Sequence, residues 1–332
     1  MPLKTKKISF TIGADPEFAI YRRLANGASR VICAGDMLAN RYRLRDKLGG
    51  GLCDQGGKSV FDLNQMGEDG SGSPCELRPS PTKDPLELVH EIAKILRDAV
   101  MGSEQMYRAE WVAGSWGRSM SLGGHIHFGV KYNYTVHAQV VERTRVLKAL
   151  DEYLGVPLML IEGVKEGTNR RTRYGYASDF RDQPWGLEYR TPGSWLVSPY
   201  VASAVLCLAK AVMHETQLDE KLGNVVTSVG EMENKCRDYG AYGCKWVTHM
   251  ETISCINSSN HAWAYKIWPD LWARIQKMVL YHTYRQYIDM IQFLIDNKLS
   301  WYPNVSMKQA WGIPCDLFPV PDRVSAKDLW KQ

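Results

Sequence analysis

Four short segments of this chain carry charged or metal-coordinating side chains two positions apart. They are Asp15-Pro16-Glu17, Glu76-Leu77-Arg78, His125-Ile126-His127 and Glu188-Tyr189-Arg190. In a β-strand, residues i and i+2 project from the same face, about 6–7 Å apart. If the four strands are neighbours, that sheet face cannot be a packed core unless metal ions or polyanions neutralise it. The pattern therefore predicts a polar, ion-binding face of a sheet.

The donor atoms of these segments indicate which ions they would bind. Carboxylate oxygens with an occasional imidazole suit Mg²⁺ or Mn²⁺ better than a thiolate-loving metal. Divalent ions beside arginines are what phosphoryl transfer needs, because cations bridge the phosphates and guanidinium offsets the equatorial charge. More arginines lie between the last two segments, and Arg173 and Arg181 are candidates for contact with phosphate. The full set is Arg170, Arg171, Arg173 and Arg181.

Each segment also has a purely structural interpretation. The exposed face of a strand is commonly polar, Glu-x-Arg can be an ion pair within one strand, and His-x-His can be two surface histidines. Basic side chains in loops are usually just solvated. The glycines beside the segments, among them Gly13, Gly123, Gly124 and Gly186, favour the functional interpretation. Glycine beside a strand often lets a ligand or another backbone approach closely.

The elements that position these segments follow from hydrophobic periodicity. Apolar residues alternate from Ile8 to Ile20, which predicts a strand with Asp15 and Glu17 on the face opposite Phe18. Short strands are also predicted at His125–Phe128 and over residues 186–191. Helices are predicted over residues 84–100, 135–155, 198–217 and 269–296, the last as one helix or two joined. We expect Gly155 to end the second of these helices.

The order of these elements predicts an α+β fold. Strands and helices do not alternate regularly, which argues against a doubly wound parallel sheet. Up to about residue 190 the chain mixes strands with two helices, and beyond that it is mostly helical. We expect a catalytic core over residues 1–200 and a helical part over residues 201–332, packed together as one unit. Near-helical spacing of aromatic residues predicts core packing for Trp263, Trp268, Trp272 and Tyr281.

Composition narrows the class of protein. The 332 residues hold 41 Lys plus Arg and 36 Asp plus Glu, so the net charge of +5 is far below that of a dedicated nucleic-acid binder. An apolar fraction of 45% is that of a globular chain. No apolar run predicts a membrane span or a secretory signal. The eight cysteines form no Cys-x-x-Cys pair, so we expect reduced thiols and a cytoplasmic protein, with a structural zinc site as the lesser alternative.

Taken in order, the four segments resemble the carboxylate–amine ligases of the glutamine synthetase and glutamate–cysteine ligase superfamily. The resemblance is to the phage-type amidoligase branch, over roughly residues 8–200. Its motifs are specific only in combination. They are Gly-x-Asp-Pro-Glu-Phe at 13–18, Glu-Leu-Arg-Pro-x-Pro at 76–81, Gly-Gly-His-Ile-His-Phe-Gly at 123–129, and Tyr-Gly with Gly-Leu-Glu-Tyr-Arg-Thr-Pro over 174–192.

This resemblance implies a fold, a ligand set and a reaction. The fold would be a curved, mainly antiparallel sheet forming a funnel that binds ATP and two or three Mg²⁺ or Mn²⁺ ions. A first ion would be held by Glu17, Asp69 and Glu76, and a second by Asp15, His125 and Glu188. Arg190 would contact the transferred phosphoryl group, His127 would contact ATP or substrate, and Arg78 would help to neutralise phosphate.

The reaction implied is amide formation between a carboxylate and an amine through an acyl phosphate. The substrates would be small molecules, peptides, proteins or modified nucleotides, and the oligomeric state stays open. Two other classes compete with this interpretation. One is a metal-dependent hydrolase that uses His125 and His127 as an imidazole pair. The other is a non-catalytic phage structural or nucleic-acid-binding protein that kept the fold.

Overall fold

The computed structural model describes most of the chain. It covers residues 9–23, 26, 28–32, 65–69, 74–102, 104–130, 136–218 and 245–313. Cys75, Cys207 and Cys255 are buried free thiols, as expected. The other five cysteines (33, 53, 236, 244 and 315) and Thr135, the expected first residue of a helix, lie outside the described residues.

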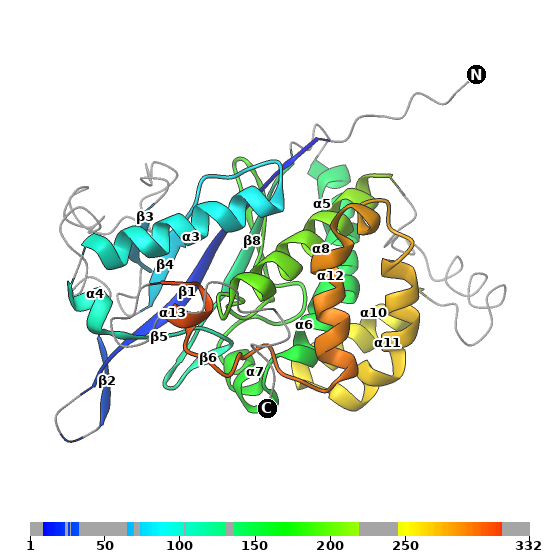
Figure 1. Ribbon diagram of the computed structural model, residues 1–332. Helices are drawn as coiled ribbons and strands as arrows, with labels where there is room; N and C mark the ends of the chain where they lie inside the picture. Colours follow the sequence, from blue (N-terminus) through cyan, green and yellow to red (C-terminus); the bar gives the residue numbers. More distant parts are fainter. Residues whose placement is uncertain are drawn as a thin grey trace.

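One antiparallel sheet forms the frame of the molecule (Figure 1). Its central strand is β1 (Thr11–Arg23), and the main path runs β3-β4-β1-β8-β10-β9. Two further strands, β2 and β5, pair with the C-terminal half of β1. Strands β6 and β7 form a separate hairpin. The other strands are β2 (Ser29–Ile32), β3 (Gln65–Glu68), β4 (Cys75–Arg78), β5 (Glu110–Val112), β6 (Trp116–Gly117), β7 (Met120–Ser121), β8 (Gly124–Gly129), β9 (Phe180–Gln183) and β10 (Gly186–Tyr189).

Strand β1 separates an apolar face from a polar one, as its alternation predicts. Ile12, Phe18 and Ile20 are fully buried on one face. Asp15 and Glu17 project from the opposite face, where Glu17 is also buried. Because the period of a strand is two, this single alternation commits both carboxylates to the same side of the sheet.

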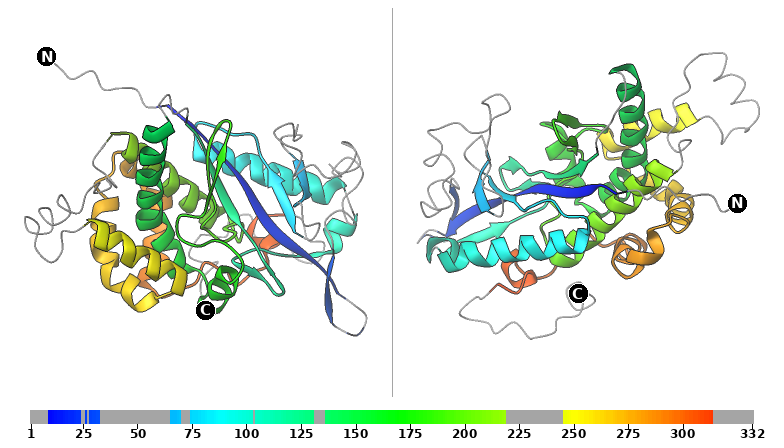
Figure 2. Two further views of the ribbon diagram at one scale, coloured as in Figure 1. Left: turned by 180° about the vertical axis from the view of Figure 1, so that it is seen from behind. Right: turned by 90° about the horizontal axis from the view of Figure 1, so that it is seen from above.

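Helices cover the apolar face and extend beyond one edge. Helices α3 (Pro85–Gly102) and α8 (Pro199–Leu218) lie on one side of β1 in the view from above (Figure 2, right) and contact each other. The mixture of one antiparallel sheet with packed helices confirms the α+β fold. The remaining helices are α4 (Glu104–Arg108), α5 (Val136–Leu150), α6 (Val156–Ile161), α7 (Val164–Arg171), α10 (Lys245–Ser258), α11 (His261–Ile275), α12 (Tyr281–Asp296) and α13 (Met307–Ala310).

The prediction that Gly155 ends a helix is wrong. Gly155 has helical dihedrals (φ −60°, ψ −48°) and closes a π-helical turn, Asp151–Gly155, that runs directly into α6. A Cβ at this position would lie 3.0 Å from both Ile256 Cδ1 and the Tyr189 hydroxyl oxygen. The glycine therefore serves close packing between elements and does not terminate the helix.

Two further helix predictions need correction. The region before residue 190 holds more than two helices, and Arg170 and Arg171 lie in one of them, α7, and not in a solvated loop. The segment predicted over residues 269–296 as one helix or two joined forms two helices, which confirms the second alternative, but the first of them begins at His261 and not at Pro269. The side chain of Asn260 accepts a hydrogen bond from the Trp263 amide there, and this N-cap sets the start of α11.

A single hydrophobic cluster runs from the sheet into the C-terminal helices. It includes Ile12 on β1 and Ile291 on α12, both fully buried. Trp268, Trp272 and Tyr281 belong to this core and Trp263 packs against it, which confirms the predicted role of these aromatic residues. Within the described part of the chain, no helix combines the length and apolar character that crossing a membrane requires.

Candidate active site

The strand register brings the four charged segments together on one face. Asp15 of β1 lies opposite His125 of β8, and Glu17 of β1 lies opposite Glu76 of β4. On the far side of β8, His127 pairs with Glu188 of β10. Directly opposed residues in antiparallel strands hold their Cβ atoms about 5 Å apart, so four segments distant in sequence become one site.

Glu17, Asp69 and Glu76 form a first cluster. Each offers one carboxylate oxygen, and the three oxygens lie within 4.8 Å of one another. Glu17 and Glu76 come from paired strands, while Asp69 directly follows β3, where its amide donates to the Pro74 carbonyl at 3.1 Å. This bond between the residues that flank the two strands sets Asp69 against the two strand carboxylates.

Asp15, His127 and Glu188 form a second cluster, again with one ligand atom each within 4.8 Å. His125 also approaches it, because its Nδ1 lies 3.2 Å from Asp15 Oδ1 and 3.8 Å from Glu188 Oε1. His127 Nε2 lies 3.0 Å from the same Asp15 oxygen, and its ring rests on that of Trp185. Both predicted histidines therefore reach the cluster, and none of the metal-ligand groups in the described residues contains a further histidine.

Burial strongly perturbs the titration of these side chains. Burial raises the pKa of Glu17 to about 7, and the nearby charge of Asp69 adds to this. Burial also raises the pKa of Glu76 well above its ordinary value, although Arg78 opposes the shift. For Asp15, burial is outweighed by His127 and His125, which lower its pKa. A site with this much buried negative charge is suited to a bound cation.

Arginines flank the clusters at different depths. Arg190 Nε lies 3.2 Å from Glu188 Oε1, and Arg181 Nη1 lies 3.6 Å from Glu188 Oε2. Arg78 is buried and its Nε pairs with Glu76 Oε1 at 2.7 Å. Arg173 is exposed and does not line the cavity described below, so the structure does not bring it to the other predicted residues.

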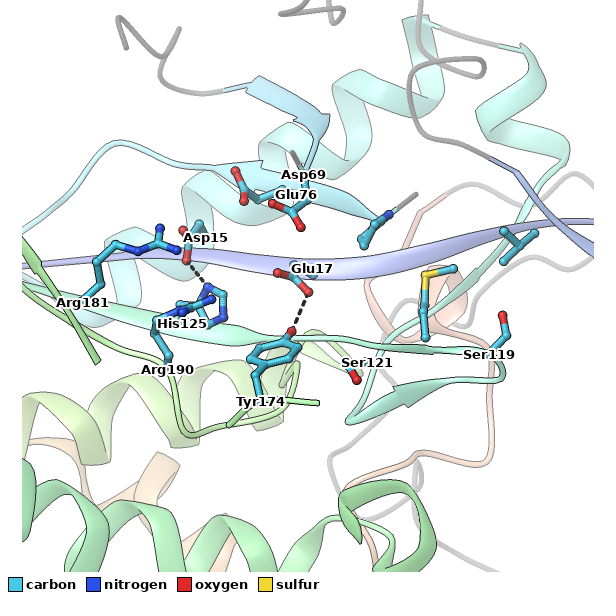
Figure 3. A pocket seen from close by; sticks show the side chains of 13 residues that line it. Asp15, Glu17, Asp69, Glu76, Ser119, Ser121, His125, Tyr174, Arg181 and Arg190 are labelled. Atoms are coloured by element: carbon cyan, nitrogen blue, oxygen red, sulfur yellow. Dashed lines mark hydrogen bonds and ion pairs between the residues drawn. The ribbon is translucent and has the colours of Figure 1, made fainter. Parts of the chain in front are cut away.

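A cavity of about 600 Å³ opens over this face (Figure 3). At one end lie Arg181, Arg190, Asp15 and His125, and Glu17 lies midway along it. Ser119 lies at the other end. Four more uncharged side chains line the cavity, those of Val31, Pro74, Met120 and Ser121. The cavity can thus hold an anion at one end and a neutral group at the other.

Two parts of the cavity lining were not predicted from the sequence. The first is Tyr174, whose hydroxyl donates to Glu17 Oε2 at 3.1 Å (Figure 3). Its position inside the Tyr-Gly motif was the only available signal. The second is the Ser119–Ser121 segment, which lies in no recognised motif. Arg170, grouped above with phosphate-contacting candidates, is fully buried and instead donates to the carbonyls of residues 122, 190 and 191.

Comparison with known proteins agrees with the resemblance carried by the motifs. The model of one family, described as phage phiEco32-like COOH.NH2 ligase-type 2, matches residues 12–228. This stretch is more than half of the chain and contains both clusters and the flanking arginines. A comparison with curated proteins found no match. The chain therefore belongs to the phage phiEco32-like COOH.NH2 ligase-type 2 family, a family of carboxylate–amine ligases.

Proposed function

We propose that the protein is an ATP-dependent ligase that joins a carboxylate to an amine, using Mg²⁺ or Mn²⁺ on the inner face of the sheet. One observation carries the proposal: two oxygen-rich clusters lie side by side in a cavity with a pair of arginines at one end, in a member of a carboxylate–amine ligase family. This is also the arrangement expected of a glutamine synthetase-like funnel.

The side chains present fit hard divalent ions. Carboxylate oxygens dominate both clusters, and imidazole is the only other donor, a set that suits Mg²⁺ or Mn²⁺. His125 Nε2 is buried and has no hydrogen-bond partner among the described residues. Glu17, Asp69 and Glu76 would hold one ion; Asp15, Glu188 and the two histidines would hold another. When bound, the ions would neutralise phosphate charge.

The remaining residues would position the reactants. Arg190, fixed beside Glu188, is suited to the phosphoryl group in transfer, since a guanidinium offsets equatorial negative charge. Arg181 is 57% exposed and would meet the nucleotide at the rim of the cavity. His127 faces the same end, and Arg78 offsets charge at Glu76. Arg173 would reach ATP only from outside the cavity.

The chemistry proposed has two steps. An oxygen of the substrate carboxylate attacks the γ-phosphorus of ATP, the bond to the bridging oxygen breaks, and ADP leaves. The amine nitrogen then attacks the acyl carbon, inorganic phosphate departs, and the nitrogen loses a proton to give the amide. The protein's contribution is positioning, charge stabilisation and exclusion of water from the acyl phosphate.

An ADP-release assay that crosses a panel of carboxylates with a panel of amines tests the proposal. ADP should form only with Mg²⁺ or Mn²⁺, a carboxylate and an amine together, and mass spectrometry should find the amide. Glu76→Gln, which keeps the shape but removes a ligand charge, should abolish turnover. Wild-type protein that bound neither ATP nor Mn²⁺ would contradict the proposal, and so would metal-dependent hydrolysis that needed no nucleotide.

A further inference from the structure

Tyr174 is an unassigned residue that contacts the first cluster from inside the cavity. Its hydroxyl donates a hydrogen bond to Glu17 Oε2 at 3.1 Å (Figure 3). The Gly123 amide donates to the same oxygen at 2.7 Å. Two donors therefore converge on Oε2 of Glu17, and neither of them occupies Oε1.

Backbone features make this convergence possible. A Cβ at Gly123 would collide with the His125 ring and come within 2.9 Å of the Tyr174 hydroxyl, so only glycine lets the three groups meet. Gly175, directly after the tyrosine, has φ +82° and lies against the Arg170 guanidinium. A side chain there would displace Arg170, and with it the ring of Tyr174.

The ring of Tyr174 is held independently of any ligand. The Arg170 guanidinium carbon lies 4.5 Å from the ring centroid, and that of Arg190 lies 5.6 Å from it. The edge of the ring meets His125, with centroids 6.0 Å apart. Arg170 is itself fixed by bonds to three backbone carbonyls. The direction of the hydroxyl is thus set by the protein before a cation arrives.

We propose that Tyr174 is a positioning residue: its hydroxyl, with the Gly123 amide, holds Glu17 so that one oxygen faces the cation of the first cluster. The inference rests on the proposed function only in requiring that this cluster binds a divalent ion. The same ring lies against Arg190, whose guanidinium pairs with Glu188 of the second cluster. Tyr174 acts through Glu17 and is not itself a ligand.

The test is Mn²⁺ binding to the full-length chain, measured by calorimetry and electron paramagnetic resonance. Tyr174→Phe keeps the ring between the arginines and removes only the hydroxyl. It should weaken Mn²⁺ at one class of site by about 10–100-fold, the usual effect of losing a group that orients a ligand. The matched control is Tyr189→Phe, which also removes a buried tyrosine–carboxylate bond, to Asp151 at 2.8 Å, but outside the cavity. It should leave both Mn²⁺ affinities unchanged.

A double-mutant cycle separates positioning from general loosening. Added to Glu17→Gln, Tyr174→Phe should cause no further loss of Mn²⁺ affinity, because the hydroxyl acts only through that carboxylate. Added to Glu188→Gln, Tyr174→Phe should weaken Mn²⁺ binding at the first cluster as much as it does in the wild-type background. Circular dichroism and thermal unfolding confirm that each variant is folded before binding is compared.

Three results would overturn the inference. They are unchanged Mn²⁺ affinity in folded Tyr174→Phe, an equal loss in Tyr189→Phe, and an undiminished effect in the Glu17→Gln background. Wild-type protein that bound no Mn²⁺ would overturn both this inference and the metal dependence of the proposed reaction. Wild type that bound Mn²⁺ with the expected cycle but formed no ADP would overturn the proposed function alone.

Discussion

At the scale of single residues, Arg190 and Arg181 reach the same carboxylate, Glu188, from different depths. Arg190 is 24% exposed and Arg181 is 57% exposed. We predict that Arg190→Lys lowers kcat for ADP formation by about 10³-fold, because a lysine cannot reproduce the planar fork that contacts phosphoryl oxygens. Arg181→Lys should change kcat less than tenfold and act mainly on the KM for ATP. Steady-state kinetics check both, and a kcat for Arg190→Lys within tenfold of wild type would contradict the assignment.

Asp151 is a buried carboxyl outside the active site that ties the loop after α7 to the sheet. It accepts hydrogen bonds from the Ser178 amide at 2.9 Å, the Ser178 hydroxyl at 2.6 Å and the Tyr189 hydroxyl at 2.8 Å. Burial raises its pKa from 3.8 to about 6, and the hydrogen bonds only partly oppose this shift. Asp151 therefore holds a proton in the folded protein over a pH range where the unfolded chain has lost it.

The sign of the resulting pH dependence follows from linkage. Because the folded pKa is the higher one, the stability that Asp151 contributes is present below about pH 4 and is lost as pH rises to about 6. The difference amounts to up to roughly 3 kcal/mol. Asp151→Asn cannot titrate, so the difference in free energy of unfolding between wild type and this variant should change across that range. Denaturant unfolding at half-unit pH steps measures it; a pH-independent difference would contradict the prediction.

At the scale of elements, one buried guanidinium ties α7 to the segments that follow β7 and β10. Arg170 donates to the carbonyls of Leu122, Thr191 and Arg190, at 2.9, 2.7 and 2.9 Å. We predict that Arg170→Met lowers the free energy of unfolding by about 3 kcal/mol or more, since methionine keeps the apolar stem but leaves these carbonyls without donors.

Arg173→Met is the matched control for this prediction. Arg173 lies three positions along the chain from Arg170 and is exposed, so its loss should change stability by no more than about 0.5 kcal/mol. Chemical denaturation of the three proteins gives the comparison. Equal stability of Arg170→Met and wild type would show that the buried hydrogen bonds are replaceable.

Local patterns predicted the elements more completely than the contacts between them. The alternation around Asp15 and Glu17 placed both on the polar face because the strand period allows one answer. The helices predicted over residues 84–100 and 198–217 correspond to α3 and α8, because the signals that start a helix are local. The prediction for Gly155 was wrong because glycine also allows close packing. Here the neighbour is Ile256, about a hundred residues away in the sequence, so no local pattern indicates the contact.

Strand register decides which residues come together in the site, and hydrophobic periodicity does not reveal the register. Opposition of Glu17 to Glu76 and of His127 to Glu188 is fixed by pairing between strands far apart in sequence. The resemblance to ligases supplied most of that information, including the inclusion of Asp69. Tyr174 was missed because a tyrosine in a turn carries no charge pattern, and its role arises only when Gly123 and Glu17 are brought beside it.

At the scale of the whole molecule, the small net charge of +5 conceals an uneven distribution. Four carboxylates, those of Asp15, Glu17, Asp69 and Glu76, line one cavity, while Arg181 and Arg190 stand at one end of it. This distribution of charge attracts divalent cations to the four carboxylates and directs an anionic nucleotide to the end that holds the arginines. Net charge alone could not indicate this, because acidic and basic groups cancel in the sum.

The chain also shares one hydrophobic cluster between the ligand-bearing strand and the C-terminal helices. Helix α12 packs on α8, which lies beneath the sheet, and Ile291 of α12 is fully buried. We predict that Ile291→Ala costs about 2–5 kcal/mol in one cooperative transition, because residues before and after position 200 unfold together. Amide hydrogen exchange should then accelerate equally at Ile12 on β1 and at Ile288 on α12.

The exposed Gln286 on the same helix supplies the control, and Gln286→Ala should change stability by no more than about 0.5 kcal/mol. Two separate unfolding transitions, or faster exchange confined to α12, would mean that the helical part unfolds on its own. In that case Mn²⁺ binding by Ile291→Ala should survive the first transition. If the chain is one unit, Mn²⁺ binding and α12 protection should instead be lost at the same denaturant concentration.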